Sequence, residues 1–285
     1  MNLQIIRKEI LEIISNKQKE LNLSFIEDTH TYFMNDINGN LQSNFPSVST
    51  VLKKFYTPFP EFEKSLQKAK GCPVRQKEIL LEWKGTADYA TNMGSRVHFL
   101  LEKYLVDLYG SYKDIRQPIF SCDDNQIFIG DNMIKAGHEF IELMHSRGAV
   151  LLDTEMVLGC PHLGYTGQPD KVWLFDKNGE LGVICTDYKT NRPKNFESHW
   201  YTIPMLKPFE QYDDTALSHY YLQLPFYVRL LLQMLKGSKY ENISFFGGVV
   251  LLLKEDATYK EYRIPKDIIT KVFDLDIKNI LQNNI

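Results

Sequence analysis

Apolar side chains recur at helical spacing along much of the chain. In residues 3 to 20 the repeat is carried by isoleucines with lysine and glutamate between them, which predicts an amphipathic helix packed on the body of the protein. This stripe consists of Ile5, Ile6, Ile10, Ile13 and Ile14. Similar periodicity predicts further helices over residues 94–109, 125–148, 215–235 and 266–282. Helices are therefore expected both before and after the middle of the chain.

Between these helices the pattern changes to short runs rich in β-forming residues. Small hairpins or strands are predicted over residues 23–42, 150–158 and 163–190. A buried strand is expected over residues 245–253, and an alternating edge strand over residues 259–264. This order predicts an α/β fold in which a central mixed β-sheet is flanked by helices.

The first third of the chain is expected to be an N-terminal extension of a single domain, residues 1–285. After the small hairpin, Pro46-Ser47-Val48-Ser49 supplies a helix start, with Ser47 or Ser49 as N-cap. A lysine-rich helical segment then runs to residue 92, with breaks near Pro58, Pro60, Gly71 and Pro73. We expect residues 1–92 to form this extension and residues 93–285 to form the core.

The hairpin of residues 163–190 brings acidic side chains together. Asn178-Gly179 is a strong signal for a two-residue type I′ turn, because that turn needs positive φ at both central positions. Counting outwards from the turn in equal steps places Asp170 directly opposite Asp187. Like charges so placed repel, and a bound cation would relieve the repulsion. Lys189 points to the same side of its strand as Asp187, so two carboxylates and an amine converge.

Composition and charge narrow the class of protein only slightly. The net charge of -3 over 285 residues neither supports nor excludes a nucleic-acid partner, because local patches or a bound metal could still attract one. No apolar run reaches the roughly 18 residues of a membrane span, and Arg7, Lys8 and Glu9 stand where a signal peptide needs an apolar core. We expect a cytoplasmic protein with no membrane partner.

The four cysteines are scattered singly along the chain. Cys72, Cys122, Cys160 and Cys185 include no C-x-x-C pair, which argues against a zinc ribbon or an iron–sulfur cluster. They are interpreted as reduced thiols, and no iron–sulfur cofactor is expected.

The lysine-rich segment of residues 49–92 has two interpretations. Its basic residues could form a solvated helical face, or they could form an arm that follows phosphates beside the active site. They are Lys53, Lys54, Lys64, Lys68, Lys70, Arg75 and Lys77. The aromatic residues among them either stack on bases or pack into the core, and these are Phe55, Tyr56, Phe59 and Phe62.

Four short signatures stand in order along the chain, on a predicted helix, a hairpin and a later helix. They are Gly-x-x-x-His-x-x-x-Glu (Gly94, His98, Glu102), Gly-x-x-Asp (Gly167, Asp170), Asp-x-Lys (Asp187, Lys189) and Gln-x-x-x-Tyr (Gln223, Tyr227). Together the four resemble the RecB-type branch of the PD-(D/E)XK nuclease superfamily, over roughly residues 94 to 255. More loosely, THTYF and PSVSTVL resemble the N-terminal region of phage-encoded and mitochondrial-genome-maintenance-type exonucleases of that superfamily.

The resemblance implies a restriction-endonuclease-like core with a metal ion at the hairpin. It implies that Mg²⁺ or Mn²⁺ is bound by His98, Asp170, Asp187 and the backbone carbonyl of Tyr188. Lys189 would be catalytic together with the two aspartates. The remaining signature residues would support the site.

The supporting residues are predicted to have different roles. By resemblance, Gln223 and Tyr227 would orient the active-site groups and contact the nucleic-acid strand, and Glu102 would be a partner of His98 or a further ligand. Glu155, on the preceding strand, is interpreted either as an acid of the metal site or the strand, or as an ordinary surface carboxylate. Candidate nucleic-acid contacts are Lys53, Lys54, Arg96 and Arg192.

The resemblance implies a metal-dependent DNA exonuclease that leaves 5′-phosphates and serves recombination, repair or replication. Its partner would be DNA, single-stranded or with free ends. RecB-type nucleases with iron–sulfur clusters carry a late cysteine cluster, and no cysteine follows Cys185 here, so that subfamily is disfavoured. Alternatives are an endonuclease, a non-catalytic DNA-binding module, and a chance arrangement in which Asp170 and Asp187 are surface acids. DNA or RNA preference, cleavage polarity and oligomeric state stay open.

Overall fold

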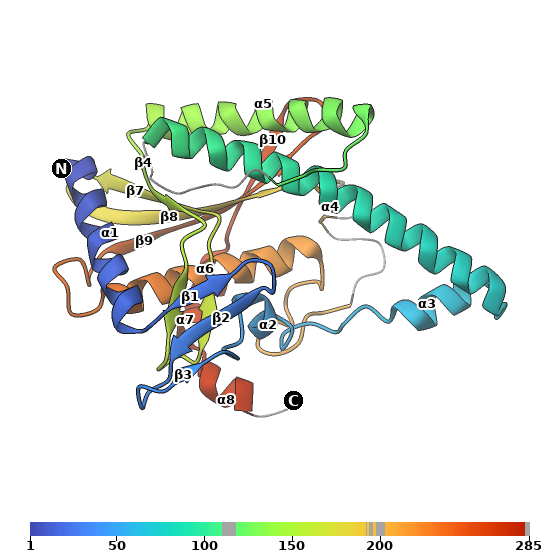
Figure 1. Cartoon of the computed structure of the whole chain (residues 1–285), viewed down its shortest axis with the longest axis horizontal. Helices are drawn as coiled ribbons and strands as arrows, with labels where there is room; N and C mark the ends of the chain where they lie inside the picture. The colour runs from blue at the N-terminus through green and yellow to red at the C-terminus, as the bar shows by residue number, and fades with distance from the viewer. Residues whose placement is uncertain (110–117, 192, 194–195, 198–202, 283–285) are drawn as a thin grey trace.

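The fold is built on a mixed five-stranded β-sheet (Figure 1), seen in a computed structural model that describes residues 1–109, 118–191, 193, 196–197 and 203–282. The strand order is β10-β9-β8-β7-β4, and only the β8–β9 pair is parallel. The strands are β4 (Val150–Thr154), β7 (Lys171–Lys177), β8 (Glu180–Lys189), β9 (Ser244–Leu253) and β10 (Tyr259–Arg263). The predicted mixed sheet and its edge strand at residues 259–264 are thereby confirmed.

Helices cover both faces of this sheet (Figure 1). One face packs against α4 and α5, with Leu101 and Phe140 buried against Trp173 of β7. The other face packs against α1 and α6, where Ile10 and Phe226 belong to the larger core cluster. These helices are α1 (Leu3–Glu20), α4 (Pro73–Tyr109), α5 (Asp124–Ser146) and α6 (Ala216–Leu235). Within the described ranges, no helix has the length and apolar character that crossing a bilayer requires.

The N-terminal extension contains the predicted small hairpin. Its strands pair antiparallel in the order β1-β2-β3. Ser47 caps the next helix by accepting a hydrogen bond from the Thr50 N–H, which confirms the first of the two predicted N-caps. The elements here are β1 (Ser24–Ile26), β2 (Thr31–Asn35), β3 (Leu41–Gln42), α2 (Val48–Leu52) and α3 (Glu61–Lys68). A separate pair, β5 (Leu158–Cys160) and β6 (Tyr165–Gly167), lies between β4 and β7 in the chain.

Two predicted helix boundaries were wrong. The helix expected to begin at Gly94 is the second half of α4, a single helix of 37 residues that starts at Pro73 and crosses the expected boundary at residue 93. A glycine inside a helix costs only about 1 kcal/mol, and here it leaves room for Thr190, whose Oγ1 would lie 2.9 Å from an added Cβ.

The closing helix expected over residues 266–282 is divided in two. It consists of α7 (Lys266–Asp274) and α8 (Ile277–Gln282). Leu275 has extended backbone, and the Asp276 carboxylate then accepts a hydrogen bond from the Asn279 N–H at 3.2 Å, as an N-cap does. The predicted loop over residues 111–124 lies partly outside the described residues, which resume at residue 118.

Candidate metal centre

The β7–β8 hairpin has the predicted register. Asn178 and Gly179 have φ values of 55° and 88°, as a type I′ turn requires. Lys177 pairs with Glu180, and the pairing continues without a shift to Lys171 and Thr186. One further step places Asp170, just before β7, opposite Asp187 in β8. The turn rule and the two-residue period of a strand thus bring the two acids together.

His98 completes a three-residue cluster from the other side of the sheet. It lies on α4, and its Nδ1 is 3.1 Å from Asp170 Oδ2. One ligand atom each from His98, Asp170 and Asp187 can be chosen so that all lie within 4.8 Å of one another. The predicted convergence of these three side chains is confirmed. The cluster thus joins residues from α4 and from the β7–β8 hairpin, which are far apart in the sequence.

Burial makes the two carboxylates unequal. Asp187 is 1% exposed, and burial together with the charge of Asp170 raises its pKa well above the ordinary value. Burial opposes ionisation of Asp170 as well, but the contact with His98 outweighs it and lowers the pKa of Asp170 well below the ordinary value. When no metal ion is bound, the two aspartates therefore carry one negative charge more readily than two.

Lys189 is the nearest cation to Asp187, with 2.7 Å between Nζ and Oδ2. Burial lowers the pKa of Lys189, but the charges of Asp187 and Asp170 more than offset that effect, so the pKa is raised. The ammonium also lies 4.2 Å from the ring centroid of Tyr220 on α6. These contacts hold the lysine on the same side as the acids, as the spacing of Asp187 and Lys189 predicted.

The cluster fits a divalent cation. Asp170 Oδ2 and both carboxylate oxygens of Asp187 are buried. His98 faces Asp170 Oδ2 and Lys189 faces Asp187 Oδ2, which leaves Asp187 Oδ1 with no hydrogen bond from any described residue. Buried acceptors in this state are costly unless another group satisfies them. Two carboxylates and an imidazole are donors that suit Mg²⁺ and, more readily because of the histidine, Mn²⁺. The three residues could therefore hold a divalent cation, and the choice of Mg²⁺ or Mn²⁺ stays a prediction.

The backbone of Glu155 positions Asp170. The Glu155 N–H donates to the Asp170 carbonyl at 3.1 Å, and the Glu155 carbonyl accepts from Gln168 Nε2 at 3.1 Å. Glu155 has a φ of +42°, a left-handed conformation that β4 adopts as it ends. Burial, and then the charge of Glu155, raises the pKa of Tyr32 to about 12. Glu155 thus acts on the Asp170 segment through its main chain, while its carboxylate lies near the N-terminal hairpin.

Glu102 and Tyr188 lie next to the cluster rather than in it. Glu102 is one turn beyond His98 on α4, and its carboxylate accepts a hydrogen bond from Thr154 of β4 at 3.1 Å. Its predicted role as partner of His98 or as further ligand stays a prediction. The Tyr188 ring packs in the core on the α4 side, with its centroid 6.3 Å from that of His98. A metal ligand from the backbone carbonyl of Tyr188 stays a prediction.

Helix α6 contributes a polar face to the site. Gln223 Nε2 donates to the Tyr227 hydroxyl at 2.7 Å, so the predicted pair is joined. Burial, with the charges of Asp170 and Asp187, raises the pKa of Tyr227 well above its ordinary value. Tyr220, which sequence reasoning missed, packs under Lys189 on the same face. Its signal was available, because Tyr220, Gln223 and Tyr227 follow one another at helical spacing.

An open groove of about 450 Å³ leads to the cluster. One wall is α4, where the residues are small apart from His98, and the other contains Lys189 and Tyr220. The lining residues are Ala90, Thr91, Gly94, Ser95, His98, Lys189, Thr190, Asn191 and Tyr220. The segment between the hairpin and α6, residues 191–213, lies partly outside the described residues. Because His98 and Lys189 are among the lining residues, the groove opens beside the metal-binding cluster.

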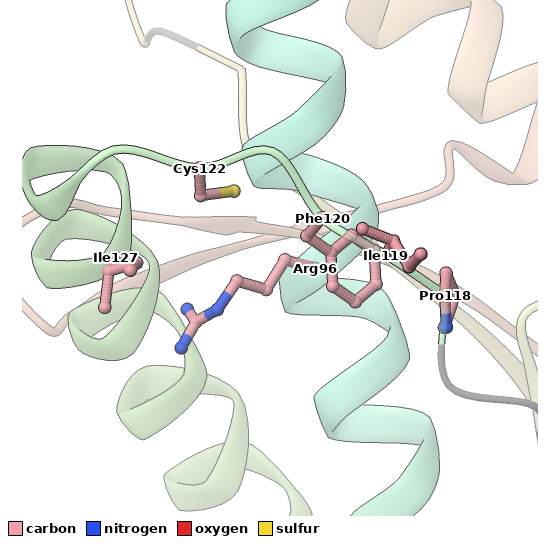
Figure 2. Close-up of a pocket in the computed structure, with 6 residues that line it drawn as sticks. All are labelled: Arg96, Pro118, Ile119, Phe120, Cys122 and Ile127. Atoms are coloured by element: carbon pink, nitrogen blue, oxygen red, sulfur yellow. The ribbon is translucent and has the colours of Figure 1, made fainter.

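Most of the predicted nucleic-acid contacts lie elsewhere. Arg96 points away from the groove toward α5, where Nη2 is 2.7 Å from Asp131 Oδ1, and it lines a separate hollow shown in Figure 2. Lys53 and Lys54 lie in the turn that follows α2 and do not line the groove. Arg192 falls outside the described residues. A role of these side chains in binding nucleic acid stays a prediction.

Gly167 controls how closely α6 approaches the site. A Cβ on Gly167 would lie 2.7 Å from Tyr227 Cε1 and 2.8 Å from Val48 Cγ2. We expect Gly167→Ala to lower the free energy of unfolding by about 1–3 kcal/mol, because the buried ring has to move. Gly85→Ala should raise it by about 0.5–1 kcal/mol, since Gly85 is an exposed position of α4 with nothing within 4 Å. Urea denaturation of both variants checks the opposite signs; equal effects would contradict the close packing.

No family model matches the chain, and no curated protein matches it. The geometry of the cluster and the sequence signatures are therefore the basis for assigning a function.

Proposed function

We propose that the protein is a Mg²⁺- or Mn²⁺-dependent deoxyribonuclease of the RecB-type PD-(D/E)XK class, with a restriction-endonuclease-like core. The observation that carries the proposal is the buried cluster of His98, Asp170 and Asp187 with Lys189 at 2.7 Å from Asp187. Two further signature residues, Gln223 and Tyr227, are hydrogen-bonded to each other on α6. Residues from a helix, a hairpin and a second helix converge here on buried carboxylates, as is typical of a functional site.

The divalent ion, when bound, would polarise a phosphoryl oxygen and lower the pKa of a coordinated water. The chain's own residues would do the rest. Asp170, Asp187 and His98 would hold the ion, with the Asp170 segment kept in place by the Glu155 main chain. Lys189 would present its ammonium to the groove, where it can orient the attacking water or stabilise charge on the phosphate. Cleavage would leave a 5′-phosphate and a 3′-hydroxyl.

We further propose that the enzyme is an exonuclease. The N-terminal segment with the looser resemblance packs against the site: the Pro46 carbonyl accepts a hydrogen bond from the Thr166 N–H at 3.0 Å, and Val48 lies against Gly167. The extension is thus part of the site's surroundings, as expected if it helps to select the substrate. DNA ends, or single strands, would be its substrates in recombination, repair or replication.

A degradation assay with end-labelled DNA tests the proposal. We expect linear single- or double-stranded DNA to be degraded with Mg²⁺ or Mn²⁺ and to stay intact with EDTA, because the carboxylates need the ion to engage phosphate. Circular single-stranded DNA is the matched control, and an exonuclease should leave it intact. Cleavage of the circle would identify an endonuclease. Failure to cleave any of these substrates with either ion would refute the nuclease proposal.

A further inference from the structure

A helical arm projects from the body of the protein. It consists of α3 and the first half of α4, and in Figure 1 it extends beyond the edge of the sheet. Its two helices are joined by Gln76 of α4, whose Nε2 donates to the Phe62 carbonyl at 2.9 Å and to Ser65 Oγ at 3.1 Å. Gln76, Ser65 and Ile79 are buried between the helices. The arm is therefore held as a defined structure.

The arm has an open apolar hollow of about 710 Å³. The rings of Phe59 and Trp83 lie next to each other there, with centroids 5.9 Å apart and planes tilted by 55°. Phe59 is 66% exposed and Leu81 is 61% exposed, which is unusual for side chains of this size. In contrast, Phe55 is in the core and the Tyr56 ring stacks on His219, so the arm contains the accessible aromatics of this segment. The hollow therefore offers flat apolar faces to a ligand.

Three lysines lie near these aromatic rings. Lys68 Nζ lies 5.6 Å from the centroid of the Trp83 ring. Lys77 and Lys84 line the hollow, together with the carboxylate of Glu61. Lys84 has a surface ion pair with Asp88 at 2.9 Å, a contact that is weak in water and readily exchanged for a phosphate. Aromatic rings among lysines are what single-stranded nucleic acid needs, because bases stack and phosphates attract cations.

A single stripe of α4 connects this hollow to the metal centre. The stripe consists of Leu80, Lys84, Ala87, Thr91, Gly94 and His98. Its spacings of four and three residues keep all six positions on one face of the helix. The first three line the hollow on the arm, and the last three line the groove that leads to the acids. Two separate openings are thus successive parts of one continuous surface.

We propose that this stripe is a track for single-stranded nucleic acid, with bases stacked on Trp83 and Phe59 while the scissile phosphate lies at the metal centre. The proposal rests on the proposed nuclease function and adds where the substrate strand runs. From Trp83 to His98 the helix rises about 22 Å at about 1.5 Å per residue. At about 3.4 Å per nucleotide, that distance corresponds to about six nucleotides. A protein partner is disfavoured, since the lysines at the hollow and the continuity with the groove favour a polyanion.

Oligonucleotide length provides the test. We expect Trp83→Ala to weaken binding of a fluorescein-labelled 12-nucleotide oligothymidine at least fivefold, the lower end of the effect of losing one stacked base. A 3-nucleotide oligothymidine is too short to span the track, so the wild type should bind it much more weakly than the 12-nucleotide strand. Fluorescence anisotropy with Ca²⁺ as the ion measures both affinities. Phe128→Ala, which removes a 65%-exposed aromatic of α5 outside the stripe, is the matched control.

The outcomes distinguish a failure of the proposed track from a failure of the proposed nuclease activity. Trp83→Phe keeps a ring and should bind the 12-nucleotide strand nearly as the wild type does. If Trp83→Ala binds and degrades long strands as well as the wild type does, the track is wrong while the nuclease stands. If the wild type degrades no nucleic acid with Mg²⁺ or Mn²⁺, the nuclease proposal itself fails. Unchanged nucleic-acid affinity combined with loss of a dimer in Trp83→Ala would assign the hollow to a second copy of the chain.

Discussion

Asp187→Asn is expected to reduce metal-dependent cleavage by at least about a thousandfold. The substitution replaces a carboxylate of the cluster with a neutral amide of the same shape. A metal ion contributes several kcal/mol of charge stabilisation to a hydrolysis, and about 4 kcal/mol corresponds to that factor. Initial rates on linear DNA at saturating Mg²⁺ or Mn²⁺ measure the loss. Asp274→Asn, an exposed acid at the end of α7, is the matched control and should cleave normally.

The same variant should fold as well as the wild type without metal. Burial and Asp170 already raise the pKa of Asp187, so a neutral side chain at this position is what the metal-free site favours. In this variant the negative charge of Asp170 still stabilises the Lys189 ammonium. With an ion at a hundred times its dissociation constant, the wild type should gain about 2.7 kcal/mol of stability, and Asp187→Asn should gain much less. Thermal unfolding with and without Mn²⁺ compares them, and an undiminished gain would exclude Asp187 as a ligand.

The hairpin acids were predictable because local rules determine their positions. A two-residue turn at Asn178-Gly179 sets the register, and the period of two along a strand brings Asp170 opposite Asp187. The same period places Lys189 beside Asp187. No tertiary information enters this argument, which is why it was confirmed position by position. His98 was predictable only through its motif, since nothing local places α4 next to the hairpin.

Features that depend on tertiary packing were missed or misplaced. Gly94 was predicted to start a helix, but it lies inside α4. A glycine is accommodated there because Thr190, which is far away in the sequence, packs against the position that a side chain would occupy. Arg96 was predicted to contact nucleic acid, and that role stays a prediction, but its orientation toward Asp131 on α5 rather than toward the groove depends on the packing of α4. Tyr220 belongs to the site only because α6 packs close to Lys189. In each case the partner lies on another element, and periodicity does not identify partners.

Lys189→Ala is expected to lower the turnover rate by about 10²- to 10⁴-fold, the range typical of losing a positioned proton-transfer or charge-stabilising group. Metal binding should persist or tighten, because the substitution removes a cation only 2.7 Å from Asp187 Oδ2. This combination distinguishes Lys189 from the ligands, whose loss reduces binding and rate together. Single-turnover cleavage gives the rate, and Mn²⁺-dependent thermal stabilisation shows that the site is intact.

Two matched variants make the result specific to the position and shape of Lys189. Lys177→Ala removes a lysine from the turn end of the same hairpin, opposite Glu180, and should leave cleavage unchanged. Lys189→Arg keeps the charge but replaces a compact ammonium with a planar fork. In a buried position stacked on Tyr220 it should restore little of the rate. Wild-type turnover in Lys189→Ala would contradict a role in the chemistry. Full rescue by Lys189→Arg would mean that charge alone, independent of its placement, is what the site requires.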